Sequence, residues 1–345
     1  MALPSIDVLM PVYNALGTVP ETLSEALSGA LSAAVDDILA QEQVELRVLA
    51  VVDTHGTGQD DGSGDWLRAR AADDQRLVVL PSEGSGLTAA LQTALKAAKA
   101  PLISHMEADD RCPPERLFKL AMALEGSLAC GQRPLSAVTS QVELIGAESR
   151  GMTRYISWQN SLLSHEEMAA ERFVEIPALH QTGLYRRDDL LAVGGYVTRG
   201  HWPADIDFWF RWFEQGLPVA KLPEKLYHWR QHERQSTRSS PQHDAQPLHA
   251  ARIHALARQH GLHGQNPRPI RLISIGGTLK TWEASLTSGP FDLVSCEPWT
   301  AKSPPPRAPE GDELILAVYG MPSAREALRR ALPGVAEPAT LLFAG

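Results

Sequence analysis

Short apolar runs alternate with longer segments of helical periodicity over the first 125 residues. The runs that predict strands are Ile6–Met10, Glu45–Val52, Leu77–Leu80 and Pro101–Ser104. Helical patterns cover Thr18–Gln41 and Gly86–Ala98, and a further helix begins near Pro113. Strands that alternate with helices of this length form βαβ units on a mainly parallel sheet. The pattern therefore predicts an α/β fold with helices flanking the sheet.

The second half continues with mixed elements and then changes character. Its predicted elements before residue 260 are a strand at Leu135–Ile145, a helix around Tyr155–Leu163, a strand at Thr182–Tyr185, an aromatic-rich helix at Asp205–Gln215 and a helix at Leu248–His260. Gly261–Pro269 resembles a linker in composition. We therefore expect one large domain over residues 1–260, with halves at 1–125 and 126–260, and a small unit over 268–345.

The tail alternates strands and helices once more. It has predicted strands at Ile270–Ile275, Phe291–Ser295, Leu314–Val318 and Thr340–Phe343, helices at Leu279–Leu286 and Ser323–Leu332, and a proline-rich loop at Pro298–Pro309. This alternation predicts a small Rossmann-like α/β unit, near the lower size limit for independent folding.

Acidic residues follow two of the predicted strands. Asp53 ends the second strand, and Glu107, Asp109 and Asp110 follow the fourth. The carboxyl ends of parallel strands meet at one edge of an open sheet, which is where such sheets bind ligands. Oxygen ligands there suit Mg2+ or Mn2+, which can hold a diphosphate. The alternative is a solvated acidic loop that favours the start of the next helix.

The ordered motifs of residues 5–240 resemble family-2 glycosyltransferases with the GT-A fold. They are Met10–Asn14, Val51–Asp53, Gly86–Ala98, Met106–Asp110, Val193–Tyr196, Pro203–Arg211, Trp229–His232 and Ser236–Arg238. The resemblance implies a GT-A fold and a metal-dependent, inverting enzyme. Such an enzyme transfers a sugar from a nucleotide-diphosphate sugar, with UDP as the expected nucleotide, to an acceptor hydroxyl.

The resemblance also implies a metal site and a nucleotide site. Asp109 matches the last Asp of an Asp-x-Asp motif that binds Mn2+ or Mg2+, and His232 matches a histidine that completes the metal shell. Glu107 stands where the family has an Asp facing the nucleoside, so its extra methylene shifts the contact. The expected base pocket consists of Pro11, Val12, Tyr13 and Asp53, with Asp53 contacting the uracil-like base.

Asp205 matches the general base of the family, the second member of a Glu-Asp pair at a helix start. The Glu of this pair is Ala204 here, and Asp207 is the next candidate for the base. The alternative interpretation of Asp205 is an acid that only stabilises the helix N-terminus. The departures at Glu107 and Ala204 leave open a weakened or inactive protein that still binds nucleotide sugars.

The tail lacks the glycine pattern of a dinucleotide site. After its first strand the turn reads Ile275 to Lys280, and alignment on Gly277 puts these two residues where the family's tails have glycine. Glycine there permits close approach of the backbone to a phosphate. We therefore expect the tail to serve a structural or acceptor-docking role and to bind no NAD(P) or FAD.

Composition limits the partners. The 345-residue chain has 43% hydrophobic and 21% charged residues, as in ordinary globular proteins, and a net charge of −9. Its three cysteines form no CxxC pair, which fits a cytoplasmic protein. No apolar run approaches the ~18 residues of a membrane span.

The acceptor remains open among a glycan, a lipid-linked sugar and a small metabolite. The segment Arg154–Asn160, together with the α/β tail, is similar to transferases that glycosylate the queuosine base of tRNA. Nucleic-acid-binding proteins normally carry a clustered basic face, so the acidic charge ranks a tRNA acceptor below the others.

Overall fold

The computed structural model divides the chain into two compact units. It describes residues 2–16, 29–55, 60–126, 134–146, 149–197, 199–232, 241, 244–259, 261–337 and 339–345. Unit 1 comprises Met1–His165, Ala178–Arg199 and Arg211–Ser239, and unit 2 comprises Glu166–Pro177, Gly200–Phe210 and Ser240–Gly345. The first part of the predicted helix at Thr18–Gln41, the Ser236–Arg238 motif and Cys130 lie outside the described residues.

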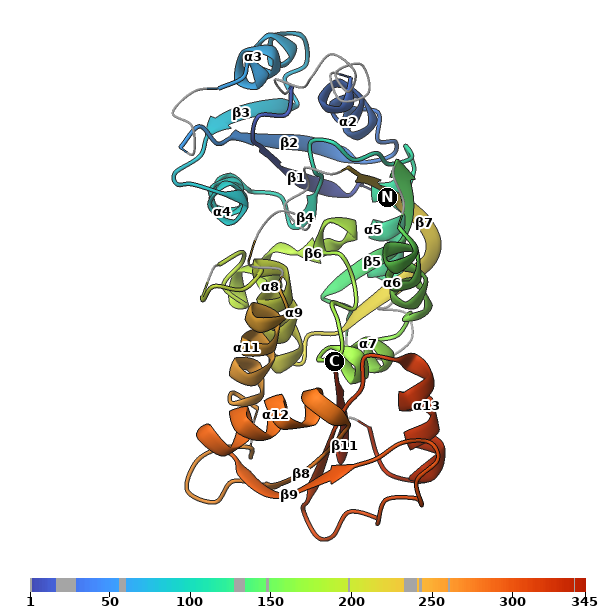
Figure 1. The fold of residues 1–345 in the computed structure, drawn as a ribbon. Helices are drawn as coiled ribbons and strands as arrows, with labels where there is room; N and C mark the ends of the chain where they lie inside the picture. Colours follow the sequence, from blue (N-terminus) through green and yellow to red (C-terminus); the bar gives the residue numbers. More distant parts are fainter. Residues whose placement is uncertain are drawn as a thin grey trace. The chain divides into compact units, whose positions relative to one another are not determined.

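A mixed, mainly parallel sheet forms the centre of unit 1 (Figure 1). In the described residues it has seven strands in the order β3-β2-β1-β4-β6-β5-β7. The strands are β1 (Ser5–Val12), β2 (Glu45–Val52), β3 (Leu77–Pro81), β4 (Leu102–His105), β5 (Ala137–Gly146), β6 (Leu184–Arg186) and β7 (Val219–Gln231). The neighbouring pairs are parallel, except that β6 runs antiparallel to β4 and β5. The prediction of an α/β fold with a mainly parallel sheet is confirmed.

Helices connect these strands. They are α2 (Ala30–Leu39), α3 (Ser63–Asp73), α4 (Leu87–Ala97), α5 (Arg116–Gly126), α6 (Arg150–Ser161), the 3-10 turn η2 (His180–Thr182) and α8 (Arg187–Ala192), while α7 (His165–Glu171) and α9 (Ala204–Glu214) each have residues in both units. Figure 1 shows α2 and α4 beside the strands β1 to β3. The central strands β1 and β2 are buried along most of their length, as expected for parallel strands covered on both faces.

The sequence pattern did not reveal α3 and β7. Leu67 is the one large apolar residue of α3 that is fully buried, so this helix has almost no apolar periodicity. In β7 the polar run around Pro223 interrupts the strand pattern. The parallel pairing of β7 with β5 takes up this interruption through register shifts next to Ser140 and Gln141.

The strands and helices predicted for the tail are all present in unit 2. A parallel sheet of order β11-β10-β8-β9 contains β8 (Pro269–Ser274), β9 (Asp292–Pro298), β10 (Leu314–Val318) and β11 (Leu341–Ala344). The helices are α11 (Ala245–Leu256), α12 (Gly276–Ser288) and α13 (Pro322–Ala331).

Buried ion pairs hold the segment 166–177 within unit 2. The carboxylate of Glu171 lies 2.9 Å from Arg325 and 2.7 Å from Arg329, both on α13. Arg252 of α11 donates hydrogen bonds to the carbonyls of Phe173 and Val174. The domain boundaries expected at residues 260 and 268 stay a prediction.

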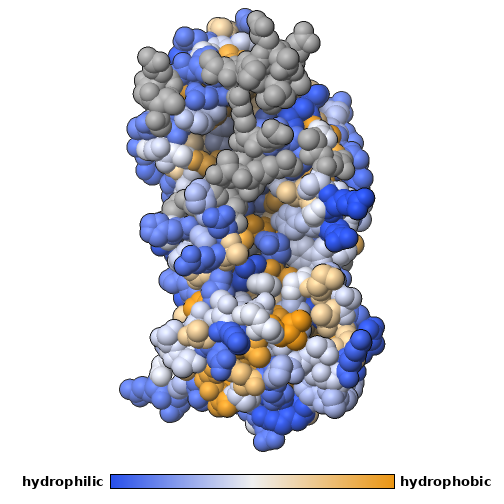
Figure 2. Space-filling model, viewed as in Figure 1, coloured by the Kyte–Doolittle hydropathy of each residue, from blue (hydrophilic) through white to orange (hydrophobic). Residues whose placement is uncertain are grey.

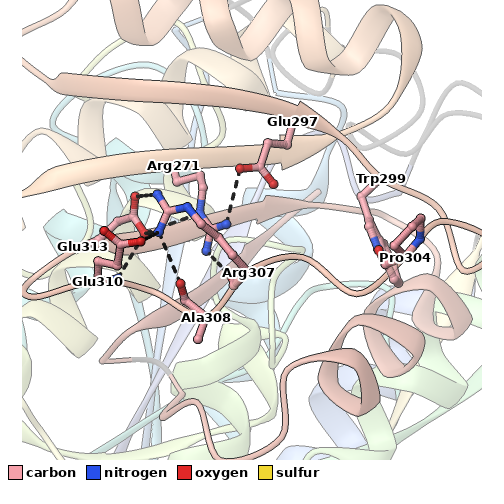
Figure 3. Close-up of polar contacts among 8 residues, drawn as sticks. All are labelled: Arg271, Glu297, Trp299, Pro304, Arg307, Ala308, Glu310 and Glu313. Atoms are coloured by element: carbon pink, nitrogen blue, oxygen red, sulfur yellow. Dashed lines mark hydrogen bonds and ion pairs between the residues drawn. The ribbon is translucent and has the colours of Figure 1, made fainter.

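The proline-rich loop between β9 and β10 is fixed at both ends (Figure 3). Near its start, the indole of Trp299 donates a hydrogen bond of 2.9 Å to the carbonyl of Pro304. At its end, Arg307 pairs with the buried Glu313 at 2.7 Å and donates a hydrogen bond to the carbonyl of Ala308. The fully buried Arg271 of β8 reaches the Arg307 carbonyl and both Glu297 and Glu313. The loop therefore has a defined conformation.

None of the described helices has the length and apolar character needed to span a bilayer.

Asp7 anchors the start of β1. It is almost fully buried, and it accepts hydrogen bonds from Arg47 and from the amides of Lys99 and Ala100. Burial opposes its ionisation, but these hydrogen bonds outweigh burial and hold the pKa of Asp7 below its ordinary value.

We therefore predict that Asp7→Asn lowers the free energy of unfolding by about 1.5–3 kcal/mol at pH 7, because an amide cannot accept from all these donors. A lowered folded-state pKa contributes stability above the ordinary pKa of about 3.9, and this contribution disappears as pH falls through the folded value. Urea unfolding at pH 7 and pH 3 would measure both effects. Asp65→Asn, at an exposed acid of α3 that pairs with Arg68, is the control. Equal losses in the two variants would contradict a role specific to Asp7.

Candidate functional site

Asp53 lies at the carboxyl end of β2, where the sequence placed it. Its side chain is buried and accepts hydrogen bonds from the amides of His55 at 2.9 Å and Gly86 at 2.6 Å. Burial opposes ionisation, but these amides and the His55 ring lower the pKa of Asp53 below its ordinary value. Gly86 has φ +88°, a left-handed conformation that favours glycine, and it directly precedes α4. Asp53 is thus an ionised acceptor that ties two loops of the sheet edge together.

Pro11, Val12 and Tyr13 lie at the same edge, at the end of β1. The carbonyl of Val12 accepts the amide of Asp53 at 2.9 Å, which joins the ends of β1 and β2. Pro11 and Val12 are buried in the sheet, whereas the Tyr13 side chain is 51% exposed. Of these three residues, Tyr13 has the ring available to a ligand.

The acidic loop after β4 is held in place by β7. Asp110 is fully buried, and it accepts hydrogen bonds from the Tyr227 hydroxyl at 2.6 Å and from the Arg230 amide at 2.7 Å. The same hydroxyl accepts the Glu107 amide at 3.2 Å, and the Arg230 guanidinium donates to the Asp109 carbonyl at 2.6 Å. Burial, together with the neighbouring Asp109, raises the pKa of Asp110. Asp110 is therefore a structural acid that orients the loop.

This loop conformation brings Asp109 and His232 together. His232 follows β7, and its Nε2 lies 2.9 Å from Asp109 Oδ2. Both side chains keep part of their surface open, 32% for Asp109 and 22% for His232. A carboxylate and an imidazole with an open side form a donor set that fits Mn2+ or another divalent ion. The two residues predicted to bind metal thus lie side by side.

Glu107 turns toward a histidine that the sequence analysis did not select. Its Oε1 lies 3.1 Å from Nε2 of His105, the last residue of β4. Burial, and then the charge of Asp109, raises the pKa of Glu107 to about 8. Burial, and then the charge of Arg116, lowers the pKa of His105 to about 3. Without a bound cation, both side chains are mostly neutral at pH 7.

His180 completes a cluster with these two residues. The donor atoms of His105, Glu107 and His180 lie within 4.8 Å of one another. Burial, and then His105, lowers the pKa of His180 well below its ordinary value. The position of His105 directly before the acidic loop could have drawn attention to it. No sequence pattern, however, links His105 to His180, which lies 75 positions later.

Asp205 belongs to unit 2. It lies in the first turn of α9, is half-buried, and accepts the amide of Ile206 at 2.9 Å through Oδ1. Asp207 is almost fully buried, with Oδ1 3.8 Å from the guanidinium of Arg258. The alternative base is therefore the more enclosed of the two acids.

Unit 2 has a cavity of its own, of about 670 Å³. Its walls come from the carboxyl ends of β8 and β10, the loop after β9 and the length of α13; they include Ser274, Ile275, Trp299, Tyr319, Met321 and Arg330. Figure 2 shows apolar side chains gathered among polar ones on the face of these C-terminal elements. This is the edge where such sheets bind ligands, and the expectation that no dinucleotide binds there stays a prediction.

Comparison with known proteins identifies the family. The sequence profile described as glycosyl transferase family 2 matches residues 7–192, more than half of the chain. The chain belongs to this family. The matched region contains β1, β2, β4 and the acidic loop, so the family assignment covers Asp53, Glu107 and Asp109 but not Asp205 or His232.

Two curated relatives are glycosyltransferases by name. The amylovoran biosynthesis glycosyltransferase AmsE of Erwinia amylovora is 28% identical over 151 residues, which are 44% of this chain and 53% of that protein. An uncharacterized glycosyltransferase of Haemophilus influenzae is 27% identical over 152 residues, 44% of this chain and 52% of that protein. The matches span about half the length of each relative.

Solved structures show the same GT-A fold. S. aureus TarS (residues 1–349) in complex with UDP-GlcNAc has a TM-score of 0.54 at 14% identity, covering 74% of this chain and 67% of that one. The mannosyltransferase PcManGT from Pyrobaculum calidifontis, in complex with GDP-Man and Mn2+, has a TM-score of 0.50 at 16% identity, covering 77% and 66%. At these identities the likeness concerns the fold alone.

We predict that Tyr227→Phe lowers the free energy of unfolding by roughly 1–3 kcal/mol, because it leaves buried Asp110 short of a donor. It should also loosen the loop that carries Asp109. Chemical denaturation measures the first effect, and hydrogen exchange of the amides at residues 107–110 measures the second. Tyr155→Phe removes the hydroxyl of half-buried Tyr155, which accepts from the buried Gln159 of α6; it lies outside the acidic loop and is the control for the exchange measurement. Unchanged stability and exchange in Tyr227→Phe would show that Asp110 does not depend on this hydroxyl.

Proposed function

We propose that this protein is a metal-dependent, inverting glycosyltransferase. It would transfer a sugar from a nucleotide-diphosphate sugar, with a UDP-sugar as the first candidate, to an acceptor hydroxyl. The observation that carries the proposal is the Asp109–His232 pair of a family-2 chain, in which Asp109 of the acidic loop lies 2.9 Å from His232, the residue after β7. The complexes of TarS with UDP-GlcNAc and of PcManGT with GDP-Man and Mn2+ support a sugar-nucleotide donor.

In this proposal Asp109 and His232 hold one Mn2+ or Mg2+ ion. An ion held by these two residues would supply Lewis-acid chemistry for the departure of the diphosphate. Around it, Asp110 and Arg230 keep the Asp109 backbone in place, since Arg230 bonds to both residues. These hydrogen bonds support a metal role for Asp109, because a pre-ordered ligand lowers the cost of binding.

The nucleoside part of the donor is assigned to the ends of β1 and β2. Tyr13 offers its exposed ring for stacking against the base, beside the backbone of Pro11 and Val12. Ionised Asp53 supplies hydrogen-bond acceptors, because a carboxylate can take more bonds than the three it makes here. The nucleoside contact expected of Glu107 requires its side chain to leave His105.

Asp205 is the proposed general base. In one in-line displacement the acceptor oxygen bonds to the anomeric carbon as the bond to the diphosphate oxygen breaks, and the diphosphate leaves with the electron pair. The acceptor hydroxyl gives its proton to Asp205, so no enzyme nucleophile is needed. The first turn of α9 favours an ionised Asp205, which can accept this proton.

A second candidate function is nucleotide-sugar binding with weak or no turnover. The contact of Glu107 with His105 favours it, because the carboxylate faces away from the nucleoside contact expected for it. Ala204 in place of the paired Glu points the same way. For an active enzyme we propose a glycan, lipid-linked or small-molecule acceptor ahead of tRNA.

We predict that Asp109→Ala abolishes metal-dependent binding of UDP, because the diphosphate loses its bridging cation. Calorimetric titration of UDP with Mn2+ should show clear binding to the wild-type protein that EDTA removes. Asp188→Ala changes an acid on α8 whose side chain is 96% exposed and should bind as the wild type does. Equal affinities in wild type and Asp109→Ala, or binding indifferent to EDTA, would exclude the metal role.

We predict that Asp205→Asn lowers the transfer rate by roughly 100- to 10,000-fold and leaves donor affinity unchanged, because it removes the proton acceptor alone. Transfer and donor binding should be measured on the same preparations, with Asp188→Asn as the control. Unchanged transfer would move the role to another residue, Asp207 first. A wild-type protein that binds donors but shows no transfer or hydrolysis across a broad panel would favour the binding function.

A further inference from the structure

A buried cluster of two histidines and one glutamate lies behind the acidic loop. His105 ends β4, Glu107 follows two residues later, and His180 begins η2. His105 is fully buried and His180 is 7% exposed, while the Glu107 side chain keeps 23% of its surface open. These residues are distinct from the Asp109–His232 pair to which the donor metal is assigned.

The backbone that carries the two histidines is fixed by several hydrogen bonds. Arg116 of α5 donates to the carbonyls of both His105 and Gln181, which joins the end of β4 to η2. The Tyr185 hydroxyl donates to the His180 carbonyl at 2.7 Å. The two imidazole rings lie 4.8 Å apart, centre to centre. The histidines are therefore held together by the fold and do not depend on a ligand to meet.

His105 has ring nitrogens with unfilled capacity. Neither nitrogen has a hydrogen-bond partner among the described residues, and the 3.1 Å approach of Nε2 to Glu107 lacks hydrogen-bond geometry. A buried polar atom without a partner is costly. A cation on Nε2 would remove this cost for that nitrogen and use the lone pair of a neutral imidazole, which is the form that binds metals.

The donor set selects the kind of ion. Two imidazole nitrogens and one carboxylate oxygen are the ligands of His2Glu zinc sites and of related Fe2+ sites. Mg2+ and Ca2+ prefer all-oxygen sites, and Mn2+ also favours carboxylate, carbonyl and water ligands. The chemistry thus differs from that of the ion expected beside the donor diphosphate.

We propose that His105, Glu107 and His180 bind a transition-metal ion, Zn2+ foremost, at a site separate from the Asp109–His232 pair. Tetrahedral ligand atoms with bonds near 2.0–2.2 Å lie about 3.4 Å apart. The 3.1 Å between His105 and Glu107 is already close to that, and the full 4.8 Å span must contract by about 1.4 Å. Side-chain rotation would have to close this span, because hydrogen bonds hold the backbone of both histidines.

Two neighbouring charges affect how tightly this cluster would bind a cation. The buried Arg116 guanidinium opposes a cation, and Asp109 attracts one, as their opposite effects on the pKa of His105 and of Glu107 indicate. An ion here would also retain Glu107 in the cluster, away from a nucleoside. Metal binding at this site does not require that the protein be a transferase.

The test uses the full chain, freed of metal by a chelator, loaded with Zn2+ and desalted. We expect the wild type to keep about one Zn2+ per chain, and Co2+ in its place to give the visible absorption of a tetrahedral site. The double variant His105→Gln/His180→Gln should lose this binding. Its affinity for Zn2+ should fall by more than 100-fold, because mutating a residue that only contacts a metal ligand already costs roughly 10- to 100-fold. Asp109→Ala should still retain Zn2+, although more weakly, because it removes a nearby negative charge and no ligand of this site.

His228→Gln, at a half-buried histidine of β7, is the matched control and should bind Zn2+ as the wild type does. Circular dichroism checks folding, and if the double variant is unfolded, Glu107→Gln replaces it and should weaken Zn2+ and alter the Co2+ spectrum. Wild type without retained Zn2+, or retention that the cluster variants leave unchanged, overturns the proposal. Retention lost only in Asp109→Ala would assign the ion to the donor site instead, and would not affect the test of UDP binding.

Discussion

The candidate site of unit 1 depends on the satisfaction of one buried acid, Asp110. A carboxyl group with no exposed surface is stable only when its oxygens have donors. The Tyr227 hydroxyl and the Arg230 amide supply them, and both belong to β7. Because the acid and the donors come from segments more than a hundred residues apart, this contact sets where the acidic loop lies against β7. The position of Asp109 beside His232 follows from it.

Acids that look equivalent along the chain have different electrostatic environments. Asp53 is ionised by backbone amides, whereas Glu107 and Asp110 are driven toward the neutral form by burial and by Asp109. Asp109 keeps the most open surface of the three acids in its loop. Like charges this close cannot all be ionised without a cation. The arrangement therefore leaves Asp109 as the acid of this loop with the most accessible side chain, while Asp110 has a structural role.

Two features of the sequence depart from the pattern of similar enzymes: the glutamate at position 107 and the tail without a glycine-rich turn. Glutamate at position 107 is long enough to bring its carboxylate within 3.1 Å of the His105 ring. The tail keeps the strand order of a ligand-binding α/β sheet and a cavity at the carboxyl ends of its strands, without the glycine turn of a dinucleotide site. Its proline-rich loop, fixed through Arg271 and Glu313, forms part of the cavity wall at Trp299.

The sequence alone determined the α/β class, the central strands β1, β2 and β4, and the placement of Asp53 and the acidic loop at one sheet edge. These features follow from local periodicity and from the rule that parallel strands end at the same edge. The tertiary structure alone decided which acid is exposed, that β7 exists despite Pro223, and that His105 meets His180. Burial, pKa and long-range pairing depend on neighbours distant in sequence, and a single chain without those neighbours in view carries no local signal for them.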